Sequence, residues 1–319
     1  MSPPLVSIII VNWNGKADTL ECLASLAADV YPNKEIIVVD NGSGDDSVAV
    51  IRGAFPAVRV IEAGENLGFT GGNNVGLRDA LARRPDYIYF LNNDTISQPD
   101  AVSELVVAAE QNPAFGLLAP VAHYFDRPDE IWFGGARINV DRGVATHDNS
   151  DPPAPGDPLR EIPWCTGCAM FLRAPLCGQL GGFDERYFLI YEDVDLSMRV
   201  RATGAKIGLV PAARICHKVG RSLGRVSQAA SYYSLRNRLL FMRERSGRGT
   251  LGAGLAAAGH LWGGLRAARQ SGTSALGGLK PGACAIRDYL LGRHGPAPKK
   301  GAAAGPVPRS ARRGGGPCL

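Results

Sequence analysis

Short apolar, β-branched runs alternate with helix-like segments through the first part of the chain. The runs are four to seven residues long and occupy Leu5–Val11, Glu35–Val39, Val58–Ile61 and Tyr87–Leu91. Runs of this kind are typical of strands buried on both faces of a sheet. Between them apolar residues recur at helical spacing, as at Leu20, Leu23 and Leu26. The alternation predicts an α/β domain with a parallel sheet and right-handed crossovers.

Polar residues follow three of these predicted strands, at the point where each strand ends. They are Asn12 to Gly15, Asp40 to Ser43 and Asn92 to Asp94. Open α/β sheets bind ligands outside the carboxyl ends of their strands. There Asp40 could accept hydrogen bonds from a base or a ribose, and Asp94 could hold a divalent ion that neutralises a diphosphate. For both residues a simple turn is an equally good interpretation.

A second acidic cluster comprises Glu192, Asp193 and Asp195, at the start of a helix predicted over 193–203. Adjacent carboxylates in a cleft can raise one pKa and leave a competent general base. For Asp195 we favour capping of the helix instead. His217 follows a strand predicted over 206–210; it could ligate a metal, although a lone histidine is more often an ordinary loop residue.

Two further motifs are weak on their own. Cys165 and Cys168 have the spacing of a metal or redox motif, but no second pair of ligands follows at comparable spacing, so buried structural cysteines are favoured. The glycine-rich stretch 68–76 matches neither a Walker A motif nor a dinucleotide fingerprint. Because it precedes a helix, its backbone could contact a phosphate or a ribose; otherwise it is a tight loop.

Taken together, the ordered segments resemble the family 2 glycosyltransferases, which are inverting nucleotide-sugar enzymes of GT-A fold, and in particular their rhamnosyltransferase-like branch. The segments are residues 6–14, 36–43, 65–74, 90–94, 181–185 with 191–195, and His217 with Gly220 and Ser222. The resemblance covers roughly residues 5–245. It implies a GT-A fold with a mostly parallel central sheet and a helical C-terminal extension.

The resemblance also implies a role for each matching residue. Asp40 would recognise the nucleotide base, and the remaining donor-binding residues would be Asn14, Asn66, Gly68, Asn74 and Asn93. Asp94 would ligate Mg²⁺ or Mn²⁺ on the donor diphosphate, with His217 completing the metal shell. Asp193, paired with Glu192, would be the general base that deprotonates the acceptor hydroxyl. Asn92 stands where the family commonly has the first Asp of its Asp-x-Asp element, and an amide brings no charge to the ion.

The implied reaction is transfer of a hexose, with L-rhamnose from dTDP-L-rhamnose as the leading example, to a glycan or lipid-linked acceptor in cell-surface polysaccharide synthesis. A second hypothesis is a sugar-phosphate nucleotidyltransferase. Such enzymes usually carry a glycine-rich basic loop after the first strand, whereas Lys16 is the single lysine there. A third hypothesis is a non-catalytic relative that binds membrane or nucleic acid.

The net charge of +5 conceals a division of the chain. From Arg236 onward there are 15 Lys and Arg against two acids, so this end carries +13 and the remainder −8. A basic, aromatic-bearing helix favours contact with anionic lipid, and the candidate contacts are Arg236, Arg238, Arg243, Arg245 and Arg248. Nucleic acid is not expected, since the basic tail has no interleaved aromatic residues.

The expected domains are a nucleotide-sugar-binding half over 1–124, an acceptor and catalytic half over 125–225, a helical extension over 226–295 and a disordered basic tail over 296–319. The N-terminus lacks a basic leader, and the seven cysteines are scattered. We therefore expect a cytoplasmic protein, with a peripheral position at the inner face of the plasma membrane and a homodimer both left open.

Overall fold

The computed structural model describes residues 2–219, 228–246, 254, 256–263, 266 and 275–297. They form two compact units. The first consists of Met1–Ile138 and Ala145–Val219, and the second of Asn139–Val144 together with the described residues from 228 onward. The domain boundaries expected at 124/125 and 225/226 stay predictions. The expected tail over 296–319 lies, from residue 298, outside the described residues.

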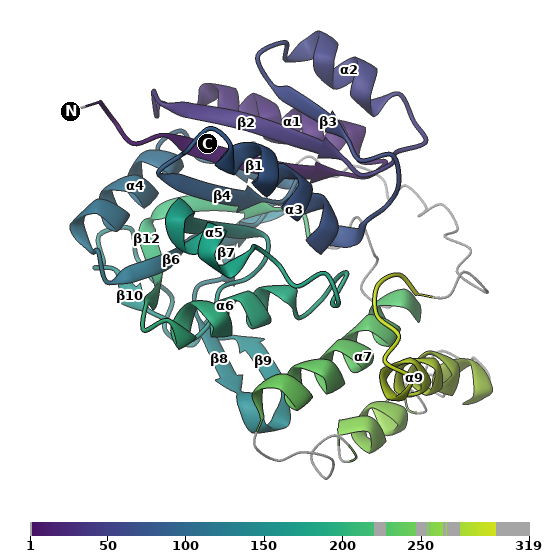
Figure 1. Ribbon diagram of the computed structural model, residues 1–319. Helices are drawn as coiled ribbons and strands as arrows, with labels where there is room; N and C mark the ends of the chain where they lie inside the picture. Colours follow the sequence, from purple (N-terminus) through teal and green to yellow (C-terminus); the bar gives the residue numbers. More distant parts are fainter. Residues whose placement is uncertain are drawn as a thin grey trace. The chain divides into compact units, whose positions relative to one another are not determined.

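The first unit begins with the predicted alternation of strands and helices (Figure 1). Its elements are β1 (Val6–Asn12), α1 (Lys16–Ala28), β2 (Lys34–Asp40), α2 (Ser47–Ala54), β3 (Arg59–Glu62), α3 (Gly68–Leu81) and β4 (Tyr87–Leu91). The four strands are parallel and lie in the order β4-β1-β2-β3. Ile8, Ile9 and Ile10 of β1 are fully buried, as a continuous apolar run requires.

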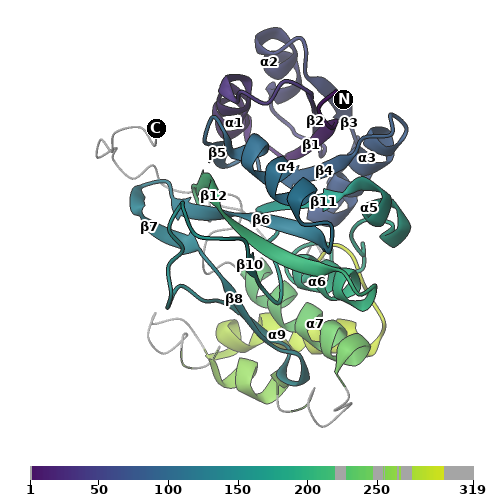
Figure 2. The same ribbon diagram turned by 90° about the vertical axis from the view of Figure 1, so that its left-hand side faces the viewer.

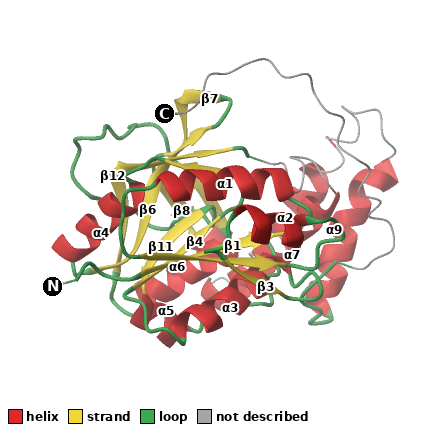
Figure 3. Ribbon diagram, turned by 90° about the horizontal axis from the view of Figure 1, so that it is seen from above, coloured by secondary structure: helices red, strands yellow, loops and turns green. Residues whose placement is uncertain are grey.

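The direction of the crossovers decides which face each helix covers. The chain moves from β1 to β2 to β3 in one direction and then returns across the sheet to β4. Right-handed crossovers therefore place α1 and α2 on one face and α3 on the other, as Figure 3 shows. The reversal occurs between β1 and β4, and ligands of open α/β sheets bind at this point, outside the carboxyl ends of the strands.

The rest of the first unit completes a mixed sheet. Its elements are β5 (Thr95–Ser97), α4 (Ala101–Gln111), β6 (Phe115–Tyr124), β7 (Arg127–Phe133), β10 (Arg160–Glu161), β11 (Ala169–Arg173), α5 (Ala174–Leu180), α6 (Glu192–Ala202) and β12 (Lys206–His217). The α/β fold with a central sheet is confirmed. One strand, β11, lies antiparallel between β4 and β6, so β6 runs in the same direction as β4. Beyond it, β12 runs parallel to β6 (Figure 2).

The region around 125–163 contains only short strands. Besides β7 and β10, it holds β8 (Ala136–Asn139), a 3₁₀ turn (Val140–Arg142) and β9 (Val144–His147). The strand predicted over 206–210 is longer than expected and continues to His217 through an irregularity between Val210 and Arg214. This extension brings His217 to the edge of the sheet where the polar strand ends lie.

The second unit is built around α7 (Gln228–Arg245) and α9 (Ala275–Leu290), which pack together. Arg236 is only 1% exposed; its guanidinium donates to the carbonyl of Gly295 and lies over the rings of Tyr232 and Tyr233. The expectation that Arg236 contacts lipid is therefore wrong, because the side chain belongs to the interior of this unit. Arg248 falls outside the described residues. Across the described part of the chain, every helix is too short or too polar to span a bilayer.

Candidate active site

A chain of hydrogen bonds joins the carboxyl ends of β1, β2 and β4. The Nδ2 of Asn12 donates to Oδ1 of Asp40 at 2.9 Å, and its Oδ1 accepts from the Thr19 hydroxyl at 2.8 Å. Thr19 in turn accepts from Nδ2 of Asn93 at 3.0 Å. These hydrogen bonds form because β1 pairs in parallel with both β2 and β4, which brings the ends of the three strands together. Asn12 and Thr19 did not emerge from the sequence as site residues, although Asn12 ends the first buried run.

Asp40 is buried, and the turn considered for it is present. Its second carboxylate oxygen accepts from the backbone N–H of Ser43 at 3.0 Å, so the residue does begin a turn. Asn14, the second donor-binding candidate at this edge, has a left-handed backbone with φ of +50°. Its Oδ1 accepts from the backbone N–H of Gly44 at 2.8 Å. The turn after β2 is thus fastened to the end of β1.

The glycine-rich stretch forms the start of α3 rather than a free loop. Asn66 Oδ1 accepts from the backbone N–H of Gly68 at 2.8 Å. Gly68 has φ of +74°, and a Cβ there would lie 2.6 Å from the Phe188 ring, so only glycine fits. Asn74 donates to the carbonyl of Phe183 at 2.8 Å and accepts from its N–H at 2.9 Å. Asn74 therefore clamps the turn at Phe183 onto α3.

Asp94 and His217 lie side by side, although 123 positions separate them in the sequence. The register of β12 places His217 opposite Thr95 of β5, the residue after Asp94. His217 Nε2 is 3.1 Å from Asp94 Oδ1, and both side chains are buried. Burial alone would raise the pKa of Asp94, but the hydrogen bond and charge of His217 outweigh it and lower that pKa. The other ring nitrogen of His217, Nδ1, is buried with no hydrogen-bond partner among the described residues.

The Asp94 and His217 pair fits a divalent cation held jointly with a substrate. One carboxylate and one imidazole suit Mn²⁺, and the buried Nδ1 of His217 has no hydrogen-bond partner among the described residues. Within the described ranges, no group of three or more His, Cys, Asp or Glu side chains could hold a metal by itself. An ion here would need further oxygen ligands from phosphate and water, which is how Mg²⁺ and Mn²⁺ are commonly bound beside nucleotides.

Glu192 and Asp193 begin α6 and form a buried acidic pair. Asp193 Oδ2 accepts from the backbone N–H of Gly167 at 2.9 Å, and Oδ1 accepts from that of Val194 at 2.8 Å. Burial raises the pKa of Asp193, and these backbone donors oppose the rise. Burial and the charge of Asp193 raise the pKa of Glu192 well above its usual value. Glu192 Oε2 has no partner in the described structure, whereas both oxygens of Asp193 accept backbone hydrogen bonds, an arrangement that favours the negative charge on Asp193.

The segment from Cys165 to Cys168 links the two acidic sites. Gly167 donates to Asp193, while the carbonyl of Cys168 accepts from the backbone N–H of Asn92 at 2.8 Å. Both thiols are free and buried, and burial raises their pKa values well above normal. The charges of Asp94 and Asp193 both raise the pKa of Cys168 further, so both carboxylates lie near this thiol. The structural interpretation of the cysteines fits these observations, but the role of Gly167 was missed.

Three non-glycine residues with left-handed backbone precede the acidic pair. Phe188, Ile190 and Tyr191 have φ of +63°, +70° and +76°. Such residues are strained and cluster at functional sites. The carbonyl of Phe188 accepts from the backbone N–H of Thr70 at 3.3 Å, which ties this stretch to α3.

Asp195 does not cap α6, contrary to the expectation. The residue flanking the N-terminus of the helix is Tyr191, and Asp195 lies within the first turn. It is buried and accepts from Arg199 Nε, one helical turn later, at 2.8 Å. The arginine compensates the charge of this buried carboxylate, and its removal would leave that charge unpaired.

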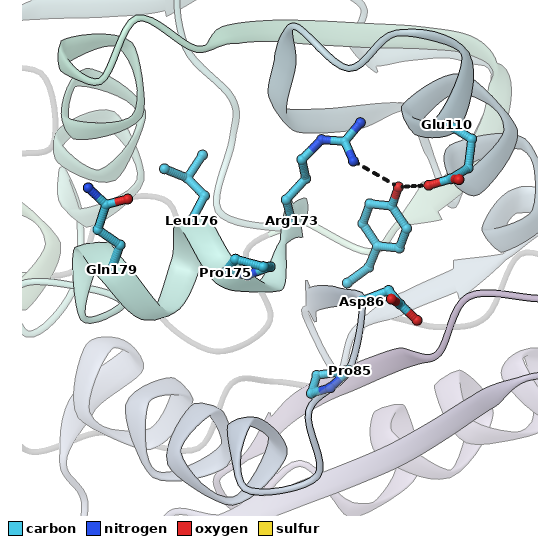
Figure 4. Close-up of a pocket in the computed structure, with 8 residues that line it drawn as sticks. Pro85, Asp86, Glu110, Arg173, Pro175, Leu176 and Gln179 are labelled. Atoms are coloured by element: carbon cyan, nitrogen blue, oxygen red, sulfur yellow. Dashed lines mark hydrogen bonds between the residues drawn. The ribbon is translucent and has the colours of Figure 1, made fainter.

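A pocket of about 390 Å³ lies at the opposite edge of the sheet, beside the start of β4 (Figure 4). Three of its polar side chains, those of Arg173, Tyr87 and Glu110, are joined by hydrogen bonds. Arg173 donates to the Tyr87 hydroxyl and to the carbonyl of Phe115, and Tyr87 donates to Glu110. The pocket is therefore separate from the acidic sites, which lie at the carboxyl ends of the parallel strands.

Comparison with known proteins agrees with this geometry. A family model described as "Glycosyl transferase family 2" matches residues 7–175. The N-acetylglucosaminyl-diphospho-decaprenol L-rhamnosyltransferase of Mycobacterium tuberculosis is 29% identical over 289 residues, which cover 81% of this chain and 92% of the relative. Galactofuranosyltransferase GlfT1 of the same organism is 26% identical over 217 residues, covering 67% of this chain and 70% of the relative.

Solved structures share the fold. The mannosyltransferase PcManGT from Pyrobaculum calidifontis, in complex with GDP-Man and Mn²⁺, has a TM-score of 0.56 at 16% identity and covers 91% of this chain and 76% of its own. The S. aureus TarS fragment 1–349 with UDP-GlcNAc has a TM-score of 0.55 at 14% identity, covering 91% and 92%. The predicted GT-A fold is confirmed, and because the family model spans more than half of the sequence, the chain belongs to glycosyl transferase family 2.

Proposed function

We propose that this enzyme is an inverting glycosyltransferase that moves a hexose from a nucleoside diphosphate sugar to a hydroxyl of a lipid-linked glycan, in cell-surface polysaccharide synthesis. The observation that carries the proposal is the arrangement around Cys168. Gly167 donates to the Asp193 carboxylate, which also accepts from Val194, and the neighbouring Cys168 carbonyl accepts from Asn92, two residues before the Asp94 that pairs with His217. A transferase needs both an anchor for the leaving diphosphate and a base for the acceptor.

Asp193 would act as the general base. As the acceptor oxygen bonds to the anomeric carbon, its proton passes to Asp193 and the bond from that carbon to the diphosphate oxygen breaks. Attack opposite the leaving group inverts the anomeric configuration. Glu192 keeps its proton, which confines the negative charge to Asp193, and Gly167 and Val194 orient the carboxylate.

The donor would lie along the ends of β1, β2 and β4. Asp40 would accept hydrogen bonds from the base or ribose, and Asn14, Asn66, Gly68 and Asn93 would border the same space. Asn74 would contribute indirectly, because its amide already binds Phe183 on both sides. Asp94 and His217, with the amide oxygen of Asn92, would hold Mg²⁺ or Mn²⁺. When bound, such an ion stabilises the charge that develops on the departing diphosphate.

Support for the sugar and the acceptor comes from the rhamnosyltransferase relative, whose name gives L-rhamnose as the sugar transferred and a decaprenol-linked acceptor. We propose dTDP-L-rhamnose as the donor. The test is release of nucleoside diphosphate from a panel of nucleotide sugars by wild type, Asp193→Asn and the exposed-carboxylate control Asp129→Asn. Unchanged turnover in Asp193→Asn contradicts the proposal, and pyrophosphate release from a nucleoside triphosphate and a sugar phosphate would indicate a nucleotidyltransferase.

We propose further that the second unit attracts an anionic membrane surface, so that a cytoplasmic enzyme acts peripherally at the inner face of the plasma membrane. Trp262, Leu290 and Leu291 are 68%, 73% and 59% exposed, and Lys280 and Arg293 are exposed cations of the same unit. Sedimentation with anionic vesicles should weaken as salt rises, while turnover of soluble donor should change little. Equal sedimentation with neutral vesicles would contradict the attraction to anionic lipid. A gel-shift assay tests the expected absence of nucleic-acid binding. Light scattering tests for a homodimer.

A further inference from the structure

An aromatic side chain outside the acidic sites packs directly on His217. Trp132, near the end of β7, meets the His217 ring at a centroid distance of 4.4 Å and an interplanar angle of 70°. The same indole meets the His147 ring at 4.6 Å and 90°. Trp132 therefore contacts two imidazoles in edge-to-face geometry, which is attractive between aromatic rings.

The position of Trp132 is fixed by its neighbours. His147 Nδ1 lies 2.8 Å from the backbone carbonyl of Trp132, and because a carbonyl can only accept, this nitrogen donates. The rings of Phe133 and Trp164 lie 5.1 Å and 5.7 Å from the His147 ring. Trp164 Nε1 donates to the carbonyl of Arg137 at 3.0 Å. The indole is thus held both through its own backbone and through a packed aromatic cluster.

His217 lacks the support that a metal-ligating histidine usually has. Such histidines generally donate their second ring nitrogen to a carboxylate, a carbonyl or a water, which fixes the ring orientation. In His217 one nitrogen faces Asp94, and the other is buried without a hydrogen-bond partner among the described residues. The contact with Trp132 is the closest ring contact recorded for this imidazole in the described part of the chain.

We propose that Trp132 is a positioning residue of the metal site: its indole fixes the His217 imidazole with Nε2 facing Asp94, in place of the usual hydrogen-bond partner. The inference rests on the proposed function, in which Asp94 and His217 hold a divalent cation. It differs from two simpler roles, filling of the core and stacking against the acceptor sugar. A core-filling residue would affect stability alone, and a stacking residue would raise the KM for the acceptor.

The test measures Mn²⁺ affinity without turnover, from the electron paramagnetic resonance signal of free Mn²⁺ in the presence of dTDP, UDP or GDP. Trp132→Leu should weaken Mn²⁺ binding about 10- to 100-fold. Trp132→Phe, which keeps an aromatic face, should stay within about threefold of wild type. Trp262→Leu, at an exposed tryptophan of the second unit, is the matched control and should bind as wild type does.

A double-mutant cycle with His217→Ala shows whether Trp132 acts through His217. Adding Trp132→Leu to His217→Ala should cause no further loss of affinity, because the ring that Trp132 orients is already absent. If Trp132→Leu does not fold, as judged by thermal melting, Trp132→Met replaces it, since methionine restores apolar volume without an aromatic face.

Two results overturn the inference while the proposed function stands. One is wild-type Mn²⁺ affinity in Trp132→Leu or Trp132→Met; the other is a loss of affinity that adds fully to that of His217→Ala. A higher acceptor KM with unchanged Mn²⁺ affinity would assign Trp132 to acceptor stacking instead. If the wild-type enzyme releases no nucleoside diphosphate from any donor, the proposed function itself fails.

Discussion

Replacing each of the two carboxylates at the start of α6 by its isosteric amide should affect turnover very differently. Asp193 accepts two backbone hydrogen bonds, whereas the pKa of Glu192 is raised well above its usual value by burial and by the charge of Asp193, and one of its oxygens has no partner in the described structure. Glu192→Gln replaces a neutral acid by a neutral amide of the same shape. Asp193→Asn removes the group that would accept the proton.

The two substitutions should differ in the size of their effect on kcat. Loss of a general base costs about 10²- to 10⁴-fold in kcat, or roughly 3–5 kcal/mol in the activation barrier, which we expect for Asp193→Asn. Glu192→Gln should stay within about threefold of wild type. Because the pKa of Asp193 is raised above 3.8, the active ionised form is lost as pH falls through a value higher than that, in wild type and in Glu192→Gln alike.

Stability provides a second measurement that does not depend on turnover. Glu192 has a folded-state pKa far above its usual 4.5, so above that pH the unfolded chain loses a proton that the folded chain keeps. Wild type should therefore lose about 1.4 kcal/mol of unfolding free energy per pH unit relative to Glu192→Gln, until the pH reaches the folded-state pKa. Urea unfolding at several pH values between 5 and 7 measures this difference.

Either of two outcomes would contradict these roles of Glu192 and Asp193. If Glu192→Gln lowers kcat more than 100-fold while Asp193→Asn stays active, the base is Glu192. If the unfolding free energies of wild type and Glu192→Gln change in parallel with pH, Glu192 is ionised in the folded protein and the assignment of the charge is wrong. Asp129→Asn, an exposed carboxylate of the same unit, is the control for both measurements.

Three further substitutions test other contacts. Gly167→Ala should lower kcat about tenfold without loss of thermal stability. The added Cβ would lie 3.3 Å from the Asp193 Cβ and displace the proposed base by a few tenths of an ångström. Normal turnover would show that Gly167 does not position Asp193. Asn74→Ala should lose about 2–3 kcal/mol in urea unfolding, because it leaves the buried N–H and carbonyl of Phe183 unpaired; a selective rise in donor KM would instead indicate direct donor contact. Cys168→Ala should keep its activity with Mn²⁺ in excess, because the thiol is free and buried; loss of turnover at unchanged thermal stability would contradict the structural role of this thiol.

The sequence predicted the parts of the structure that depend on local pattern. The continuous apolar run at Leu5–Val11 correctly indicated a buried strand, and the polar residues after it correctly indicated an edge where side chains meet. The sequence did not reveal how strands distant in the chain pair with one another. Nothing in the local sequence shows that β11 enters antiparallel beside β4, which is why the contact between Cys168 and Asn92, and with it the role of Gly167, was missed.

Side-chain orientation on a helix was the second source of error. Arg236 stands among other arginines on α7, and composition alone suggested a solvated or lipid-facing side chain. The neighbouring helix α9 supplies Asp288, which accepts from the Tyr232 hydroxyl at 3.0 Å, and the residues after α9 supply the carbonyl that Arg236 binds. A buried arginine can be recognised only once such partners from distant segments are known.

The left-handed residues before α6 bear on how this enzyme can evolve. Phe188, Ile190 and Tyr191 each hold a conformation that costs an L-amino acid roughly 1–2 kcal/mol and that glycine adopts freely. Selection for heat resistance should therefore favour glycine at these positions, while selection for turnover should oppose it, because a looser chain would no longer hold the following carboxylates in place. Laboratory lineages selected only for thermostability should accumulate glycine at these positions and become slower catalysts. In this short stretch, higher thermal stability would therefore come with lower turnover.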